Sequence, residues 1–232
     1  MFKSYVLKSK SFIDFLYMFI SNIIKKGFGF VREIILAYFF GSSMVYANFL
    51  LLKTAADLFS QLTQGSALQA SLLSNFSSLY AKGHKVSLSN VLVFSKNLAW
   101  KIFLVSQIIQ IPLVFYISPE NFWLFIMISL VLGLVVSSNF FSSIFLIVIQ
   151  GKGDFKKFSI STAVDIFVST VLLYPLSLMF GVVGIAVSRA IGLGVLIYKY
   201  FIPIFNETEG YKIGFGMKDI NLSIMLLGNF AN

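Results

Sequence analysis

KKGFGFVREIILAYFFGSSMVYANFLLLKTAADLFSQLTQGSALQA, residues 25–70, is a pair of long apolar segments with charged side chains inside them. The two segments are joined by Gly41-Ser42-Ser43, a sequence typical of a tight turn. A charge at the centre of a bilayer costs at least about 2.5 kcal/mol, so each one has to face protein, water or a ligand. The hairpin therefore predicts the functional site, and its charged residues are Lys25, Lys26, Arg32, Glu33, Lys53 and Asp57.

The composition is that of a membrane protein. Of the 232 residues, 58% are hydrophobic and only 12% are charged, and the apolar blocks are longer than a soluble core helix needs. The net charge is +9, but the lysines lie between apolar blocks, where they orient the chain and meet anionic membrane lipids. A nucleic-acid partner is therefore not expected. The sequence has no cysteine, which excludes disulfides, thiolate metal sites and thiol catalysis.

The apolar segments predict an all-α fold, a polytopic membrane bundle of six transmembrane helices. The expected helices cover 12–40, 44–80 with a break at Gln64-Gly65-Ser66, 97–117, 122–149, 158–180 and 182–202, with a loop at 81–96. Residues 1–203 would form one lobe. Residues 204–232 would be a cytoplasmic connector and the start of a truncated seventh helix, because an apolar stretch of about 13 residues is too short to cross a bilayer.

The distribution of lysine predicts a cytoplasmic N-terminus. With that orientation, twelve lysines fall in the segments on the inside of the membrane, whereas the three outside turns hold no Lys or Arg. An excess of basic residues on the cytoplasmic side is the general rule for multi-pass proteins. Both ends of the six-helix lobe are thus expected inside.

The depth of each charge follows from the geometry of an antiparallel hairpin. Each residue rises about 1.5 Å, so residues of the two arms are level when their numbers sum to about 85. Glu33 is then level with Lys53, and Lys26 with Asp57. Lys53 and Asp57 are also four residues apart on one helix, the spacing of an ion pair.

Arg32 has no carboxylate partner in this scheme, and neither does one of Lys25 and Lys26. Arg32 would lie roughly 13 Å from the outer turn, near the middle of the bilayer. An unpaired arginine there requires an aqueous cavity or an anionic ligand. The excess of positive charge favours diphosphate, which suits both the fork of a guanidinium and the point charge of a lysine.

A purely structural charge network is the alternative, and it could include Asp165 or Arg189. Direct pairing of these two is not expected, because straight helices would place Asp165 about 10 Å above the cytoplasmic end of its helix and Arg189 about 10 Å below the outer end of the next. Gly184, Ser188 and Gly192, at four-residue spacing, form a ridge suited to close helix contact.

The fourth predicted helix has a polar middle, formed by Ser137, Ser138, Asn139, Ser142 and Ser143. These side chains either make hydrogen bonds between helices or line a wet cavity.

At the same hairpin the sequence resembles the lipid II flippases (MurJ/MviN type) of the multidrug/oligosaccharidyl-lipid/polysaccharide exporter superfamily. The matching motifs include Gly29-Phe30-Val31-Arg32-Glu33, Phe40-Gly41 and Gln64-Gly65-Ser66-Ala67. A weaker likeness extends through residues 156–160 and the sixth helix, over nearly the whole chain. The resemblance implies that Arg32 and Lys26 line a cationic cavity that holds a lipid-linked diphosphate, between this lobe and a second lobe of similar size.

The resemblance implies a flippase of the bacterial inner membrane. It would translocate an undecaprenyl-diphosphate-linked glycan by alternating access of two lobes, the C-terminal lobe being supplied by the same gene, a separate chain or a second copy. The family's acidic residue on the second helix falls at Ala47, and its arginine pair falls near Ser60 and Gln61. The glycan therefore stays open between lipid II and a polysaccharide repeat unit.

Site residues are predicted in two groups. Substrate contacts are expected from Arg32, Lys26, Lys25 and Lys53, and support from Glu33, Asp57, Asp165 and Arg189. No enzymatic activity, metal or cofactor is expected, because the sequence has no His/Cys cluster, no carboxylate pair at catalytic spacing and no phosphate-binding glycine loop. The alternatives are a multidrug cation antiporter, with Asp57 and Asp165 as ion-binding carboxylates, and a fragment that does not transport.

Overall fold

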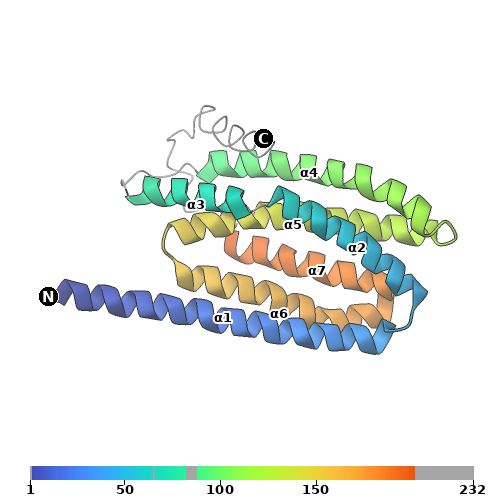
Figure 1. The fold of residues 1–232 in the computed structure, drawn as a ribbon, viewed down its shortest axis with the longest axis horizontal. Helices are drawn as coiled ribbons and strands as arrows, with labels where there is room; N and C mark the ends of the chain where they lie inside the picture. The colour runs from blue at the N-terminus through green and yellow to red at the C-terminus, as the bar shows by residue number, and fades with distance from the viewer. Residues whose placement is uncertain (1, 65, 82–87, 202–232) are drawn as a thin grey trace.

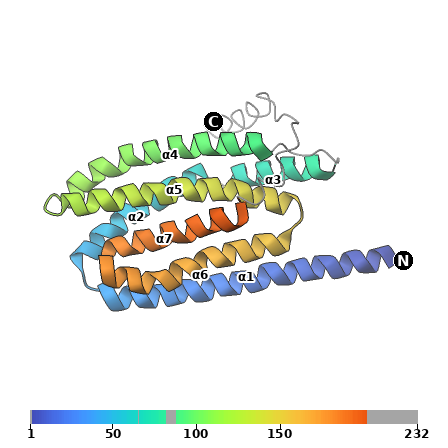
Figure 2. The same ribbon diagram turned by 180° about the vertical axis from the view of Figure 1, so that it is seen from behind.

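The computed structural model describes residues 2–64, 66–81 and 88–201, and this part of the chain is helical with no strand (Figures 1 and 2). The helices are α1 (Phe2–Phe40), α2 (Met44–Thr63), α3 (Ser66–Ala81), α4 (Leu88–Ile117), α5 (Phe122–Gly151), α6 (Phe155–Phe180), α7 (Val182–Leu196) and the π-helix η1 (Ile197–Phe201). The predicted connector and seventh helix lie outside the described residues. The all-α fold is confirmed.

α5 is the centre of the bundle. It packs against α2, α3, α4 and α7, while α1 packs along α6, and α6 packs on α7. α5 and α7 thus join the α1–α6 pair to the layer formed by α2, α3 and α4 (Figure 1). The side chains of Phe125, Ile128 and Phe145, all on α5, are fully buried in this core.

The predicted turns lie where the sequence placed them. Residues 41–43 separate α1 from α2, residues 118–121 separate α4 from α5, and Gly181, with a φ of 56°, separates α6 from α7. A positive φ favours glycine because it has no Cβ. The break near Gln64 is also confirmed, since α2 ends at Thr63 and α3 begins at Ser66.

Two helices begin about ten residues before the predicted position, and the other ends differ by three residues or fewer. α1 begins at Phe2 instead of residue 12, and α4 begins at Leu88, so the prediction of a loop over 81–96 is wrong for residues 88–96. The apolar residues 91–94 continue the helical pattern before Lys96, so α4 is longer than the predicted span 97–117.

The two arms of the hairpin do not lie side by side, which corrects a central expectation. α1 packs along α6, whereas α2 packs on α4 and α5. The arms meet at the turn and diverge away from it (Figure 1). Helices that are consecutive in sequence commonly pack together, but here the apolar faces of α1 and α2 find other partners. The space between the arms is where the charged residues gather.

Four of the described helices are long and apolar enough to cross a membrane. The corresponding segments are Ser95–Ile117, Phe122–Gly151, Phe155–Phe180 and Val182–Phe201. α1 and α2, which carry the charges of the hairpin, are not among them, so the count of six spans stays a prediction. Large apolar side chains such as Phe115, Trp123 and Phe180 are exposed on the outside, as in a multi-pass membrane protein.

The small-residue ridge of α7 makes the close contact predicted for it. A Cβ added at Gly192 would lie 2.9 Å from the main-chain oxygen of Asp165, and one at Gly184 would overlap the backbone of Leu176. The two glycines therefore allow α7 to approach the backbone of α6.

Candidate functional site

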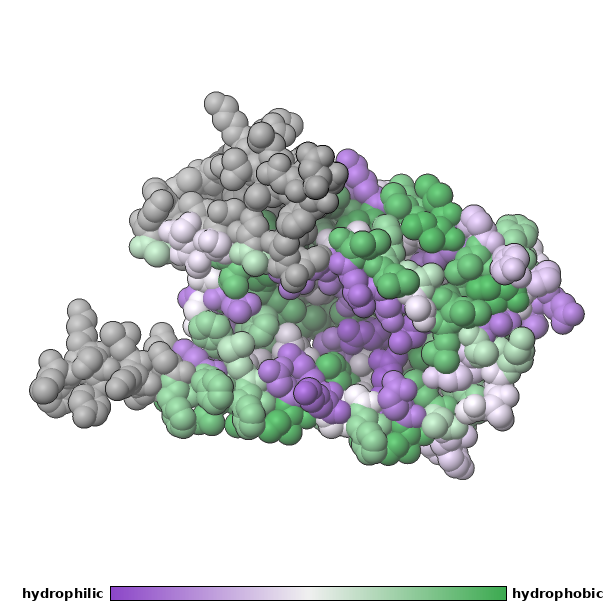
Figure 3. Space-filling view, in the orientation of Figure 1, coloured by the Kyte–Doolittle hydropathy of each residue, from purple (hydrophilic) through white to green (hydrophobic). Residues whose placement is uncertain are grey.

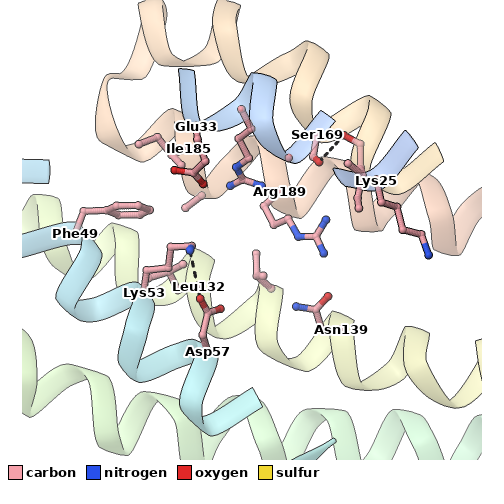
Figure 4. A pocket seen from close by; sticks show the side chains of 15 residues that line it. Lys25, Glu33, Phe49, Lys53, Asp57, Leu132, Asn139, Ser169, Ile185 and Arg189 are labelled. Atoms are coloured by element: carbon pink, nitrogen blue, oxygen red, sulfur yellow. Dashed lines mark hydrogen bonds and ion pairs between the residues drawn. The ribbon is translucent and has the colours of Figure 1, made fainter. Parts of the chain in front are cut away.

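A cavity of about 330 Å³ opens between α1 and α2, with α5, α6 and α7 forming the rest of its wall. In Figure 3 hydrophilic residues gather in this hollow, with apolar residues around it. The residues that line the cavity are Lys25, Gly29, Arg32, Glu33, Phe49, Lys53, Asp57, Leu132, Val135, Asn139, Ile166, Ser169, Ile185, Ala186 and Arg189 (Figure 4). The central cavity thus draws its charges from α1, α2 and α7.

The central cavity is electropositive. Four basic and two acidic residues line it, which gives the lining a net charge of +2. Asp165 lies directly behind the wall and is paired with Arg189, so the net charge with this carboxylate included is +1. A cavity with this charge favours an anionic ligand, and its low-dielectric walls strengthen the attraction.

Arg32 lines the cavity without an ion-paired partner. No salt bridge or hydrogen bond joins its guanidinium to another side chain in the described ranges 2–64, 66–81 and 88–201. A structural network that neutralises all the charges of the hairpin is therefore absent from this part of the chain. Glu33, the neighbouring residue, also lines the cavity, and its carboxylate makes no ion pair among the described residues.

Lys53 and Asp57 form the ion pair that their spacing predicted. The Lys53 Nζ lies 3.3 Å from the Asp57 Oδ2, and the two side chains are 40% and 56% exposed (Figure 4). Glu33 and Lys53 face the same cavity, as the depth estimate indicated, but Lys26 is exposed and does not belong to the lining, so it does not meet Asp57 there.

Replacing Asp57 with Asn is expected to change the free energy of unfolding by less than about 1 kcal/mol, because an exposed ion pair contributes little. Unfolding in mixed micelles, followed by circular dichroism, measures this change. Asn has nearly the same shape as Asp, so the variant isolates the charge. A loss several times larger would show that Asp57 supports the fold through more than its contact with Lys53.

Arg189 and Asp165 form an ion pair that the sequence analysis did not expect. The Arg189 Nη1 donates a hydrogen bond to the Asp165 Oδ2 at 2.8 Å, and the two side chains are only 26% and 10% exposed. The expectation failed because α7 approaches α6 closely at Gly192, which contacts the backbone of Asp165. Gly192 is three residues from Arg189, about 4.5 Å along the helix, and the long arginine side chain spans that distance.

Of the two neighbouring lysines of α1, Lys25 lines the central cavity and Lys26 does not. Its Nζ lies 5.9 Å from the centre of the Phe158 ring, a cation–π arrangement, and no carboxylate pairs with it among the described residues. Lys25 and Arg32 are seven residues apart, two turns of α1, and therefore lie on one face of that helix.

The polar middle of α5 is divided between two cavities. Asn139 lines the central cavity, while Ser137 and Ser138 line a second one. The hydroxyls of Ser137 and Ser143 donate to backbone oxygens of their own helix, so the expected hydrogen bonds between helices are not made by these two. Ser169 of α6 was not singled out from the sequence, because a single serine in an apolar helix gives no signal of its own.

A helical multi-pass membrane protein with a charged cavity among its helices has the general arrangement of a secondary transporter. No protein-family model matches the chain, and no curated protein matches its sequence. Among solved structures it is similar to a transporter of the MOP superfamily from Pyrococcus furiosus Vc1 (DSM3638), with a TM-score of 0.65 and 15% sequence identity. The match covers 88% of this chain and 46% of the transporter, so the chain spans about half the transporter's length. At this identity the likeness is one of fold.

Proposed function

We propose that this chain is the N-terminal lobe of a flippase that moves an undecaprenyl-diphosphate-linked glycan, lipid II or a polysaccharide repeat unit, across the bacterial inner membrane. The N-terminus would be cytoplasmic. The fold shared with a MOP superfamily transporter supports transport, and the charge of the central cavity supports the anionic substrate. Transport by this route needs no covalent step, since rocking of two lobes around the site is sufficient.

Arg32 is the observation that carries the proposal. Its guanidinium lines the cavity, and no carboxylate is bound to it in the described part of the chain. The guanidinium is therefore available to bind an anionic ligand. A guanidinium binds phosphate oxygens in a bidentate manner, and Lys25 adds a second charge on the same face of α1. Lys53 and Arg189 face the same space and can contribute, although each is already paired with an aspartate.

The polarity of the cavity is the property on which the substrate class depends. The P. furiosus structure is described in terms of a reverse polarity of its binding pocket that suggests a different function. In this chain the lining is positive, which suits a diphosphate and opposes a cationic drug. The carboxylates that a cation antiporter would use, Asp57 and Asp165, are both engaged by basic side chains. The antiporter is therefore the weaker candidate.

The proposed partner is a second lobe that covers the space between α1 and α2. The chain spans about half of the transporter to which it is similar. The second lobe could be encoded by the same gene, by a separate chain or by a second copy of this one.

Replacing Arg32 with Ala in the complete transporter is expected to lower translocation of the lipid-linked glycan by about tenfold to a hundredfold, the value of one charged hydrogen-bonded contact. Translocation is measured in proteoliposomes with a fluorescently labelled undecaprenyl-diphosphate glycan. Arg32→Lys keeps the charge but loses the planar guanidinium that binds two phosphate oxygens, so its rate of translocation should be intermediate.

Lys26→Ala is the matched control, since Lys26 is on the same helix, six residues away, but is exposed and outside the cavity. It should leave translocation nearly unchanged. An Arg32→Ala variant that translocates like the unmodified protein would refute the diphosphate role. So would equal losses in the Arg32→Ala and Lys26→Ala variants.

A further inference from the structure

A second cavity, larger than the first at about 540 Å³, lies between α4, α5 and η1. It is lined by Lys96, Asn97, Ala99, Trp100, Lys101 and Phe103 of α4, by Leu134, Ser137, Ser138 and Phe141 of α5, and by Ile197 of η1. We call it the α4–α5 groove. The proposed flippase function does not use it.

The groove and the central cavity are on different sides of α5. Successive residues of a helix are about 100° apart, so Leu134 and Phe141 project roughly opposite to Leu132 and Asn139, which line the central cavity. A ligand in the groove would therefore not compete for the same space as a substrate between α1 and α2.

Two lysines give the groove its charge. Lys96 and Lys101 both line it, and neither is ion-paired to a carboxylate in the described portion of the chain. The lining contains no Asp or Glu. Both lysines are exposed and no acidic side chain of the lining binds them, so they are available to an anion, and Asn97 adds an amide that can donate a further hydrogen bond.

The lysines are at the level where phospholipid headgroups meet the hydrocarbon. α4 runs from Leu88 to Ile117, and about 20 of its residues, counted back from the turn at 118–121, are enough to cross the hydrocarbon, so Lys96 is near the end of that length. Lys101 is about 7.5 Å further in, a distance that a flexible lysine stem covers. Trp100 is 60% exposed and stacks on Phe103 with 5.4 Å between ring centres. Tryptophan is enriched at this level of the membrane.

The opposite wall of the groove, formed by α5, carries the apolar side chains Leu134 and Phe141 together with Ser137 and Ser138, and it is open to the outside. Leu134 is half exposed, and Phe141 is partly buried beside it. The lining thus combines two basic groups with apolar side chains of both helices, which match the headgroup and the acyl chains of an anionic phospholipid. Basic pockets between transmembrane helices are known binding places for anionic headgroups.

We propose that the α4–α5 groove is a binding site for an anionic membrane phospholipid, whose phosphate is held by Lys96 and Lys101 and whose acyl chain packs on Trp100 and Leu134. The site depends on the membrane around the protein and not on the transported substrate. If no phospholipid binds in the groove, the flippase proposal is unaffected. If the flippase proposal fails, the lipid site is unaffected in the same way.

Trp100 supplies a built-in reporter, because the chain has only two tryptophans. In a Trp123→Phe background the fluorescence of Trp100 is recorded in phosphatidylcholine bilayers that contain a small fraction of acyl-brominated lipid, either phosphatidylglycerol or phosphatidylcholine. Bromine quenches a tryptophan that it touches. We expect the apparent affinity for brominated phosphatidylglycerol to exceed that for brominated phosphatidylcholine by about tenfold or more, and the Lys96→Gln/Lys101→Gln variant to abolish the preference.

Lys156→Gln/Lys157→Gln is the matched control, since it removes two exposed lysines at the same end of the bundle, at the start of α6, outside the groove. It should keep the preference within about twofold, as should Lys96→Arg/Lys101→Arg, which retains the charge and guards against a folding defect. Equal quenching by the two lipids, or a preference that survives loss of both groove lysines, would overturn the proposal. Displacement of the lipid by inorganic phosphate at low millimolar concentration would also overturn it, because the ligand would then be a soluble phosphate.

Discussion

Replacing Arg189 with Gln is expected to lower the free energy of unfolding by about 3–5 kcal/mol, the cost of leaving one member of a buried ion pair without its partner. Asp165 is the group left behind. Its side chain is 10% exposed, its Oδ2 receives the hydrogen bond from Arg189, and its Oδ1 has no hydrogen-bond partner. Arg32 and Lys25 are close enough to attract this carboxylate, but neither is hydrogen-bonded to it, so they compensate only in part.

Asp165→Asn should lower the free energy of unfolding less than Arg189→Gln does. The charge that remains in Asp165→Asn is that of Arg189, which lines the central cavity, where water can reach the guanidinium. The double variant should be more stable than Arg189→Gln alone, since no isolated charge remains in it. Unfolding in mixed micelles, measured for both single variants and the double variant, gives the coupling energy directly. Equal losses in the two single variants would show that Asp165 and Arg189 are equally hydrated, contrary to the arrangement around the cavity.

The sequence predicts what depends on neighbours along the chain. The apolar lengths predicted helices, Gly41-Ser42-Ser43 and Gly181 predicted turns, and the four-residue spacing of Lys53 and Asp57 predicted their ion pair. Each of these needs only the geometry of one helix or one turn. The cavity position of Arg32 followed from the cost of its charge in a bilayer, again a property of a single residue.

The sequence does not predict what depends on the choice of partner helix. The estimate that paired Lys26 with Asp57 assumed that α1 and α2 lie in contact, but α1 packs along α6 and the arms diverge (Figure 1). The estimate that separated Asp165 from Arg189 treated α6 and α7 as straight and parallel, whereas their approach is set by Gly184 and Gly192. In lipid, packing is decided by small residues and polar contacts more than by hydrophobicity, so apolar patterns carry little information about it.

Gly184→Ala is expected to destabilise the α6–α7 pair by about 1–3 kcal/mol, the usual cost of forcing an extra group into a packed interface. A Cβ at this position would overlap the main-chain oxygen and carbon of Leu176 and approach the backbone nitrogen of Ser177. Backbone atoms cannot rotate away as a flexible side chain does, so α7 has to shift as a whole. The shift would also move Arg189, which is five residues further along α7, relative to the central cavity.

Gly194→Ala is the control that separates this contact from the general effect of glycine in a helix. A Cβ at Gly194, in the same helix, would meet nothing within 4 Å. Alanine there should therefore stabilise α7 by up to about 1 kcal/mol through its higher helix propensity. The two variants make the same chemical change in α7, so opposite signs in their unfolding free energies would assign the loss to the contact with α6. Equal effects would contradict this, because they would mean that α7 does not depend on close approach at Gly184 and that the placement of Arg189 has another cause.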